Sequence, residues 1–268
     1  MGDIPGHPVR FLPLEGGCNF RDIGGYRTND RRTIRWGCVF RAGVLSYFTE
    51  TDQEKLARLG VRAICDLRRA DERTKEPTRW PAGHIQPLCF EDEGAVPGAV
   101  ALSGAEWTIA GVHAAMNAVY RDLPRWMEAR LRGFFRCLLQ GRTPIVVHCA
   151  EGKDRTGMAV AVLLSALGVS RDSVVEDYLL SNEAVNYENF IAIRNKSGLG
   201  VAHTANAKRR LTSIPDEVRA EIFKADADYL QAAFEEIDVK YGGMDAYLAK
   251  ALGIDDATRQ RIADLLLI

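Results

Sequence analysis

The residues best suited to chemistry in this sequence lie in a short polar turn between Cys149 and Arg155. An apolar run, Ile145 to Val147, precedes the turn and predicts a strand, and the apolar stretch that follows the turn predicts a helix. A cysteine placed before a helix N-terminus and beside an arginine forms its thiolate more readily than a free cysteine does. Cys149 has this predicted position, which makes it a candidate nucleophile.

The turn also has the features of a phosphate-binding loop. Its backbone N–H groups and the dipole of the following helix favour a bound dianion. Gly152 supplies the backbone freedom of a tight curl, and Arg155 can bind two phosphate oxygens at once. The Thr156 hydroxyl is expected to hydrogen-bond the thiolate and help it leave, and the chemistry requires no metal. The residues expected to bind the phosphate are Ala150, Glu151, Gly152, Lys153, Asp154 and Arg155.

A cysteine six positions before an arginine is a weak signal without its context. The alternative interpretation is a buried core cysteine beside a charged surface run, Lys153 to Arg155. The complete order of strand, histidine, cysteine, glycine, arginine, hydroxyl and helix favours the phosphate loop over this alternative.

Cleavage of a phosphate ester also needs a proton for the leaving oxygen, and a positioned carboxylic acid typically contributes ~10²–10⁴-fold. Asp66 follows an apolar run, Val61 to Cys65, that predicts a buried strand, and ligands of α/β sheets bind at such strand ends. A helix N-cap explains Asp66 equally well. Asp154, in the turn itself, is the second candidate, and Asp22 and Asp92 are more remote ones.

The composition is that of a globular protein. Of its 268 residues, 47% are hydrophobic and 26% charged, and the formal net charge is −1. This balance gives no reason to expect binding to nucleic acid. No repeat or separating linker is evident, so we expect a single phosphatase domain over residues 1–268.

The cysteines and the termini bear on cofactors and localisation. The six cysteines are scattered, and their spacing fits neither a zinc site nor a disulfide framework, so no cofactor is expected. The first 17 residues lack the segments of a classical signal peptide, and no stretch predicts stable membrane insertion. These features favour a cytoplasmic protein, with export by a non-classical route left open. The sequence does not indicate an oligomeric state.

Periodicity predicts the elements that must position the turn in the first half of the chain. A short strand is expected within Thr33–Arg41, and Thr51–Glu54 fits a capping box for a helix that ends at Gly60. Ile85–Phe90 is a further short strand candidate. Residues 91–120 are loosely patterned at first and are expected to form a lid or mobile insert.

The second half is predicted to be mostly helical. Pro124 suits the first turn of a helix that runs to Gln140, and Ser170 is expected to cap another. A loose segment over Gly198–Asn206 separates these from a helical C-terminal part beyond Pro215. Its expected core positions are Leu230, Phe234, Ile237, Tyr241, Ile262, Leu265 and Leu266.

The stretch from His148 to Gly157 reads His-Cys-x-x-Gly-Lys-Asp-Arg-Thr-Gly and resembles the signature of the protein tyrosine phosphatase superfamily. This version is similar to the bacterial tyrosine/lipid phosphatase branch. Most of the chain takes part in the resemblance. The other matching stretches are Asn19–Asp22, Asp66–Arg68 with Glu72, Tyr120–Pro124, Asp177–Leu179 with Ser181–Asn182, and Tyr241–Gly243 with Tyr247–Leu248.

The resemblance implies an α/β fold with a central, mostly parallel sheet flanked by helices. It implies hydrolysis of phosphate monoesters through a phosphocysteine intermediate, with protein phosphotyrosine as the first substrate to consider. Dual specificity toward phosphoserine and phosphothreonine is an extension, and a phosphoinositide or inositol phosphate is the alternative substrate class. The expected partner is therefore a phosphorylated protein or a phosphoinositide.

By position, the resemblance makes Cys149 the nucleophile and Arg155 the phosphate clamp. It favours Asp66 over Asp154 as the acid, and it implies that Lys153 contacts a second acidic group of the substrate. The sequence departs from the classical enzymes because Trp80-Pro81 is followed by alanine and not by the aspartate of their mobile loop. The expected supporting residues are His148, Thr156, Asn19, Arg21 and Asp22.

Two further functions are compatible with an anion-binding cysteine loop. A sulfur-transferring enzyme is disfavoured because Arg155, Thr156 and Gly157 continue the phosphatase pattern. A phosphate-binding module without turnover gains no support, because Cys149 and Arg155 are both present.

Overall fold

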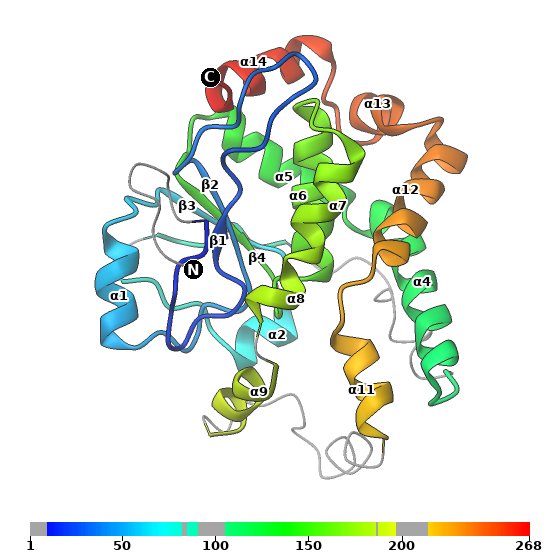
Figure 1. The fold of residues 1–268 in the computed structure, drawn as a ribbon. Coiled ribbons are helices and arrows are strands. Elements are labelled where there is room, and N and C mark those ends of the chain that lie inside the picture. The colour runs from blue at the N-terminus through cyan, green and yellow to red at the C-terminus, as the bar shows by residue number, and fades with distance from the viewer. Residues whose placement is uncertain (1–9, 82–84, 91–104, 186, 197–213) are drawn as a thin grey trace.

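The computed structural model describes residues 10–81, 85–90, 105–185, 187–196 and 214–268. In these ranges a four-stranded sheet has the order β1-β2-β4-β3 (Figure 1). β2, β4 and β3 run parallel, and β1 is antiparallel to β2. The predicted α/β fold with a mostly parallel sheet is therefore confirmed. The strands are β1 (Arg21–Asp22), β2 (Val39–Ala42), β3 (Ala63–Asp66) and β4 (Ile145–His148).

The register aligns the carboxyl ends of the three parallel strands. Ala42 of β2 and Asp66 of β3 both lie opposite His148 of β4. Since Cys149 directly follows His148, these three strand ends meet beside the candidate nucleophile. This is the edge at which open α/β sheets bind their ligands.

Helices make up most of the remaining described chain, as Figure 1 shows. In the first two thirds they are α1 (Glu50–Ala57), α2 (Ala70–Lys75), α4 (Ile109–Trp126), α5 (Glu128–Leu139), α6 (Asp154–Ala166), α7 (Arg171–Leu179), α8 (Ser181–Ala184) and α9 (Tyr187–Lys196). The C-terminal part holds α11 (Asp216–Phe223), α12 (Ala227–Tyr241), α13 (Met244–Ala246), the π-helical turn η1 (Tyr247–Ala251) and α14 (Asp256–Leu266).

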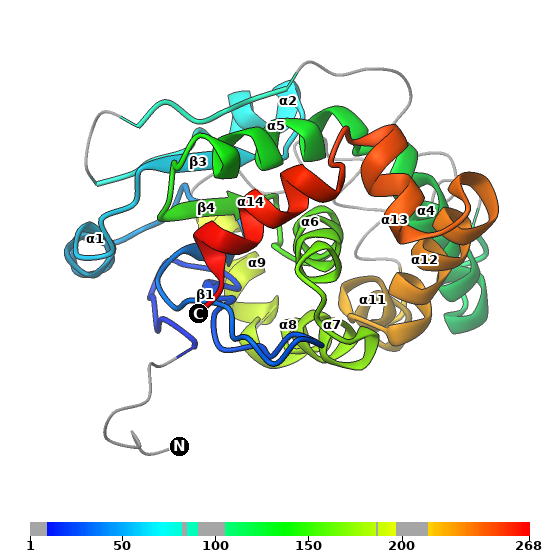
Figure 2. The same cartoon turned by 90° about the horizontal axis from the view of Figure 1, so that it is seen from above.

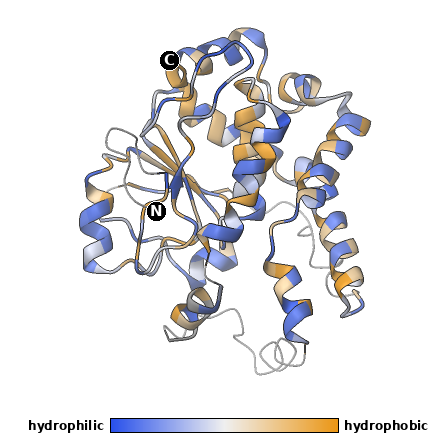
Figure 3. Ribbon diagram, viewed as in Figure 1, coloured by the Kyte–Doolittle hydropathy of each residue, from blue (hydrophilic) through white to orange (hydrophobic). Residues whose placement is uncertain are grey.

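The two faces of the sheet are covered unequally. Ile145 and Val147 of β4 face the larger core, which includes residues of α4, α5, α6, α12 and α14. Val146 faces a smaller core that includes Leu56 of α1. Figure 2 shows α1 far from α6 on the other side of the strands, and Figure 3 shows that α1 is mostly hydrophilic. The central strand is thus buried on both faces, as its unbroken apolar sequence predicts.

Four predicted details differ from the structure. The capping box of α1 begins at Thr49 and not at Thr51, because the Asp52 carboxylate binds the Thr49 N–H and also the N–H groups of Glu15 and Gly16. Pro124 does not begin a helix but lies in the last turn of α4, whose apolar face continues into the core.

The third difference concerns the last helix, where Leu265 is 40% exposed although Leu266 beside it is buried. Neighbouring residues lie about 100° apart around a helix, so α14, which packs on one side only, buries Leu266 and exposes Leu265. The predicted strand at Ile85–Phe90 is present only as a bridge between Leu88 and Cys65.

Some predictions lie outside the described residues. These are residues 91–104 of the lid or insert predicted over 91–120, the candidate Asp92 and the loose segment 198–206. The later part of that predicted insert, from Ile109 to Tyr120, belongs to α4, which packs in the core. In the described ranges, none of the helices has the length and apolar composition needed to cross a membrane.

Candidate active site

Cys149 lies between β4 and α6, with its side chain almost fully buried. We call residues 149–155 the phosphate loop. Gly152 turns the chain within it with a φ of +73°, which is unfavourable for residues with a Cβ. A Cβ at this position would lie only 2.6 Å from the Ala42 carbonyl carbon and the Gly43 nitrogen. The tight curl predicted for this glycine is therefore present.

Three successive carbonyl groups of the phosphate loop are held on its outer side. The Ala150 oxygen accepts from the N–H of Val44 at 2.9 Å. The Glu151 oxygen accepts from Asn19 Nδ2 at 3.2 Å, and the Gly152 oxygen accepts from Arg41 at 2.8 Å. Because each peptide N–H points opposite to its carbonyl, this arrangement turns N–H groups toward the inner side, where an anion binds.

A buried charge network behind the loop holds Arg41 in place. Asp177 of α7 forms ion pairs with Arg41 and with Arg21, whose Nε lies 3.6 Å from Asp177 Oδ1. Tyr26 donates to the same carboxylate at 3.1 Å. Burial and the neighbouring Arg41 lower the pKa of Arg21 to about 9. Arg21 also donates to the Asn19 side chain, so the network reaches the loop at two carbonyls.

The predicted supporting residues near the N-terminus thus divide into two kinds. Asn19 and Arg21 support the phosphate loop, whereas the Asp22 carboxylate binds the N–H groups of Gly24 at 2.7 Å and Gly37 at 2.6 Å and so shapes a turn. These contacts leave Asp22 no evident part in proton transfer.

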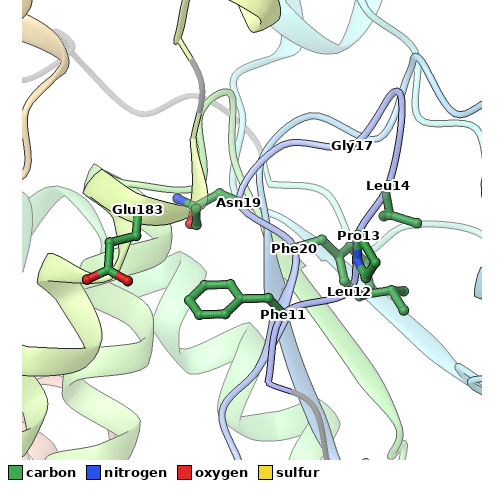
Figure 4. A pocket seen from close by; sticks show the side chains of 9 residues that line it. Phe11, Leu12, Pro13, Leu14, Gly17, Asn19, Phe20 and Glu183 are labelled. Atoms are coloured by element: carbon green, nitrogen blue, oxygen red, sulfur yellow. The ribbon is translucent and has the colours of Figure 1, made fainter. Parts of the chain in front are cut away.

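Asn19 also lines a pocket of about 210 Å³ on the side of the N-terminal segment (Figure 4). Phe11, Leu12 and Phe20 contribute apolar walls, and Glu183 of α8 lies across from them. Asn19 therefore stands between this pocket and the loop carbonyl that it binds.

Arg155 is fixed by a second side chain, Glu72 of α2. Its two terminal nitrogens donate to the two Glu72 oxygens at 2.7 and 2.8 Å. Burial opposes the charge of Glu72, but the attraction of Arg155 outweighs it and lowers the pKa of Glu72 to about 2. Burial likewise opposes the charge of Arg155, and Glu72 raises its pKa above the usual value. Since a guanidinium has five N–H donors, the pair leaves others for a phosphate.

Asp154, the first residue of α6, has a phenol as its closest partner. Tyr120 of α4 donates to Asp154 Oδ1 at 2.6 Å, and the hydroxyls of Tyr120 and Tyr178 lie 2.7 Å apart. Burial, together with the nearby Asp154 charge, raises the pKa of both tyrosines, so both remain protonated donors. The Asp154 side chain is 27% exposed. Its position is thus fixed while one face stays accessible.

Lys153 does not have the position that the resemblance implies. Its side chain is buried, and Nζ donates to the carbonyls of Ile222 at 2.7 Å and Lys224 at 3.1 Å. Asp154 Oδ1 lies 3.5 Å from the same Nζ. Lys153 therefore ties the phosphate loop to the end of α11, and its ammonium group is occupied by the protein itself.

Asp66 is enclosed by cationic and hydroxyl donors. Arg68 donates to its two oxygens at 2.9 and 2.7 Å, and Thr78 donates at 3.0 Å. His148 Nε2 lies 3.4 Å from Asp66 Oδ2. Burial opposes its charge, but His148 and Arg68 outweigh burial and lower its pKa. These contacts favour the ionised form of Asp66, whereas the predicted role of proton donor requires a protonated carboxyl.

The two remaining predicted residues also contact the main chain. The Thr156 hydroxyl donates to the Ala42 carbonyl oxygen at 3.4 Å. The predicted hydrogen bond was to the Cys149 thiolate instead. His148 Nδ1 lies 3.3 Å from the Cys149 carbonyl oxygen. Both side chains therefore contact backbone carbonyls, one of Cys149 itself and one at the neighbouring end of β2.

Sequence reasoning assigned no role to four residues that the structure brings to the loop: Arg41, Glu72, Tyr120 and Asp177. Glu72, Tyr120 and Asp177 lie in stretches that resemble the phosphatase family, and this resemblance is the sequence feature that points to them. Arg41 lies at the end of a predicted strand, and that position alone is only a weak indication of a role at the site.

One group of potential metal ligands occurs in the described ranges: His113, Glu221 and Asp226. It contains no loop residue. The Lys224 ammonium already binds the Asp226 carboxylate at 2.7 Å, so a cation of the protein balances the charge there.

Comparison with known proteins identifies the family of this chain. Residues 12–268 match the model of the tyrosine phosphatase family. The chain is 33% identical over 288 residues to the triple specificity protein phosphatase PtpB of Mycobacterium tuberculosis, covering 97% of this chain and 99% of that protein. It is 32% identical over 246 residues to a Cupriavidus necator protein named as a tyrosine-protein phosphatase, covering 89% of this chain and 83% of that one.

Proposed function

The chain belongs to the tyrosine phosphatase family and is a hydrolase of that type, and we propose that it works through a phosphocysteine formed on Cys149. The observation that carries this proposal is the phosphate loop, whose outward carbonyls are bound by Val44, Asn19 and Arg41. These contacts support a preformed anion-binding curl, and electrostatic preorganisation of this kind lowers barriers.

In the first step, the phosphate of the substrate binds the N–H groups of the loop and the free donors of Arg155. The Cys149 thiolate attacks phosphorus, a sulfur–phosphorus bond forms, and the bond from phosphorus to the ester oxygen breaks. Asp154 gives its proton to that oxygen, so a neutral alcohol or phenol leaves.

In the second step, water attacks the phosphocysteine. Asp154, now a carboxylate, takes one proton from the water, and the sulfur–phosphorus bond breaks. Phosphate and the thiolate are released, and Asp154 again carries its proton. Asp154 is chosen over Asp66 because Tyr120 fixes one of its oxygens while the side chain stays partly exposed.

We propose protein phosphotyrosine as the main substrate, with phosphoserine and phosphothreonine as slower ones. The relative from Mycobacterium tuberculosis is named for triple specificity, which supports testing more than one class. A phosphoinositide substrate was suggested only by Lys153, as a contact for a second acidic group. Lys153 instead donates to two backbone carbonyls, so this argument no longer supports the alternative.

The decisive experiment compares wild type with Cys149→Ser on a small aryl phosphate in the presence of a chelator. We expect turnover by wild type and a loss of at least ~10³-fold in the variant, since the nucleophile carries the covalent step. Cys89→Ser is the matched control, because Cys89 is an exposed cysteine on no part of the loop. If wild type and Cys149→Ser are equally inert, the chain is a binding module and the proposal fails.

A further inference from the structure

The phenol that holds Asp154 is itself held by a second phenol. Tyr120 of α4 donates to Asp154 Oδ1 at 2.6 Å, and the hydroxyl of Tyr178, on α7, lies 2.7 Å from that of Tyr120. The two rings meet edge to face, with centroids 6.0 Å apart and an angle of 72° between their planes. Both side chains are buried, so each hydroxyl depends on the partners that the protein supplies.

The number of hydrogens fixes the direction of these hydrogen bonds. A phenol has one hydrogen to donate, and its oxygen can also accept. Tyr120 gives its hydrogen to the Asp154 carboxylate, so it has none left for Tyr178. The Tyr178 hydroxyl therefore donates to the Tyr120 oxygen, which satisfies both buried groups. If the pair were reversed, Asp154 would lose its donor and the Tyr178 hydrogen would lose its acceptor.

Tyr178 is held from two sides. A Cβ at Gly157, in the first turn of α6, would lie 2.9 Å from Tyr178 Cδ2, so the ring packs directly on the backbone of that turn. Burial raises the pKa of Tyr178, and a hydrogen bond from the Asp226 backbone acts in the opposite direction. The neighbouring Ala225 is held by the Asn182 side chain through hydrogen bonds of 2.8 and 2.9 Å. Tyr178 thus has a defined position relative to the start of α6, where Asp154 lies.

The two oxygens of Asp154 have different surroundings. Tyr120 donates to Oδ1, and the Lys153 ammonium lies 3.5 Å from the same oxygen. Among the described residues, Oδ2 has no such donor, and the side chain is 27% exposed. An oxygen toward which donors already point is the poorer place for the acidic proton, because that proton would meet their hydrogens. Protonated Asp154 therefore carries its proton on Oδ2 as long as Tyr120 keeps donating to Oδ1.

We propose that Tyr178 is a positioning residue that keeps the transferable proton of Asp154 on Oδ2. By donating to Tyr120, it commits the Tyr120 hydrogen to Asp154. Without the Tyr178 hydroxyl this constraint is lost, and Tyr120 can accept the acidic proton from Oδ1, which leaves no proton directed at the leaving oxygen. This inference rests on the proposed function and adds a residue to the step in which Asp154 protonates the leaving group.

The test compares kcat on two aryl phosphates, one whose phenol has an ordinary pKa of about 10 and one whose phenol is strongly acidic. The readout is the ratio of the first kcat to the second, because a structural defect or a loss of folded enzyme lowers both values and leaves the ratio unchanged. Tyr178→Phe keeps the ring, and it is expected to lower this ratio roughly twofold to tenfold, the range of one neutral hydrogen bond.

A double variant separates action through Tyr120 from any other effect. If Tyr178 acts only by committing the Tyr120 hydrogen, its hydroxyl has no role once that of Tyr120 is gone. The variant with both Tyr120→Phe and Tyr178→Phe is therefore expected to have the same ratio as Tyr120→Phe alone. Two independent effects would instead multiply.

Tyr229→Phe is the matched control. The Tyr229 ring is also buried, at 5.6 Å from the Tyr120 ring, but its hydroxyl donates to Glu221 at 2.9 Å. It is expected to leave the ratio unchanged. The inference is overturned if Tyr178→Phe keeps the wild-type ratio, if the two effects multiply in the double variant, or if Tyr229→Phe lowers the ratio as much. Failure of the proposed function is a separate result, namely wild type that hydrolyses neither ester or Asp154→Asn that keeps the wild-type ratio.

Discussion

Carboxylates approach the phosphate loop from two regions, and the groups that hold them differ. In the segment from Asp66 to Glu76, three carboxylates each pair with an arginine: Asp66 with Arg68, Glu72 with Arg155 and Glu76 with Arg194. At the start of α6, Asp154 instead accepts a hydrogen bond from the Tyr120 phenol. Its ion-pair partner is Lys153, at 3.5 Å and already bound to two carbonyls, and its charge also acts on the neighbouring Arg155.

We propose that this difference separates structural from catalytic carboxylates. An arginine is always charged, so it keeps its partner ionised and unable to supply a proton. A phenol fixes one carboxyl oxygen by a hydrogen bond and adds no positive charge. Residue type does not distinguish Asp66 from Asp154, but their partners do.

The largest expected effect is on stability, from Asp66→Asn. The substitution leaves Arg68 buried without its counter-charge, and breaking a buried pair costs about 3–5 kcal/mol of unfolding free energy. Urea unfolding measures this loss. Activity per folded molecule is expected to stay within about threefold. A stable Asp66→Asn protein that has lost catalysis would reverse the assignment of the two aspartates.

The second effect is a loss of stability at low pH. The pKa of Glu72 is lowered to about 2, so its pair with Arg155 stabilises the fold above the unfolded value near 4.5 and is lost as pH falls toward 2. Over that window the pair accounts for about 3 kcal/mol of unfolding free energy. Glu72→Gln has no carboxyl group to protonate there, so its stability is expected to fall less steeply between pH 4.5 and 2. If the unfolding free energy falls equally steeply with pH in both proteins, Glu72 does not cause the loss of stability in acid.

The third effect is on rate, from Tyr120→Phe. Loss of the hydroxyl leaves the Asp154 carboxyl free to rotate, and a hydrogen bond to a charged group corresponds to roughly a tenfold change. We expect that loss in kcat for an alkyl phosphate. Tyr241→Phe is the control, because it removes a phenol that donates to Glu128 at 2.8 Å, far from the loop. If both variants keep the wild-type kcat, Tyr120 does not position the acid.

Local features were predictable from the sequence. The strand at Ile145, the curl at Gly152 and the start of α6 within one residue of Arg155 depend on neighbours in the chain, so their pattern indicates them. The buried strand before Asp66 was predicted for the same reason. Pro124 shows the limit of this approach, because the packing of α4 in the core overrides its helix-starting preference.

The partners of the site residues were not predictable in this way. Glu72 and Arg155 are 83 positions apart, and Lys153 binds a carbonyl 69 positions away. Tyr120 reaches Asp154 across 34 positions. Such pairs form only when helices pack, and no local spacing encodes them. The sequence therefore identified both candidate aspartates but not the partners that distinguish them.

The central claim is that Asp154 supplies the proton, and a leaving-group series tests it most directly. The kcat values of wild type, Asp154→Asn and Asp66→Asn are compared on aryl phosphates whose phenols range from strongly acidic to an ordinary pKa of about 10. We predict that Asp154→Asn loses ~10²–10⁴-fold on the poorest leaving groups and little on the best, while Asp66→Asn follows wild type throughout. An equal loss across the series for Asp154→Asn, with the steep dependence found in Asp66→Asn, would contradict the claim.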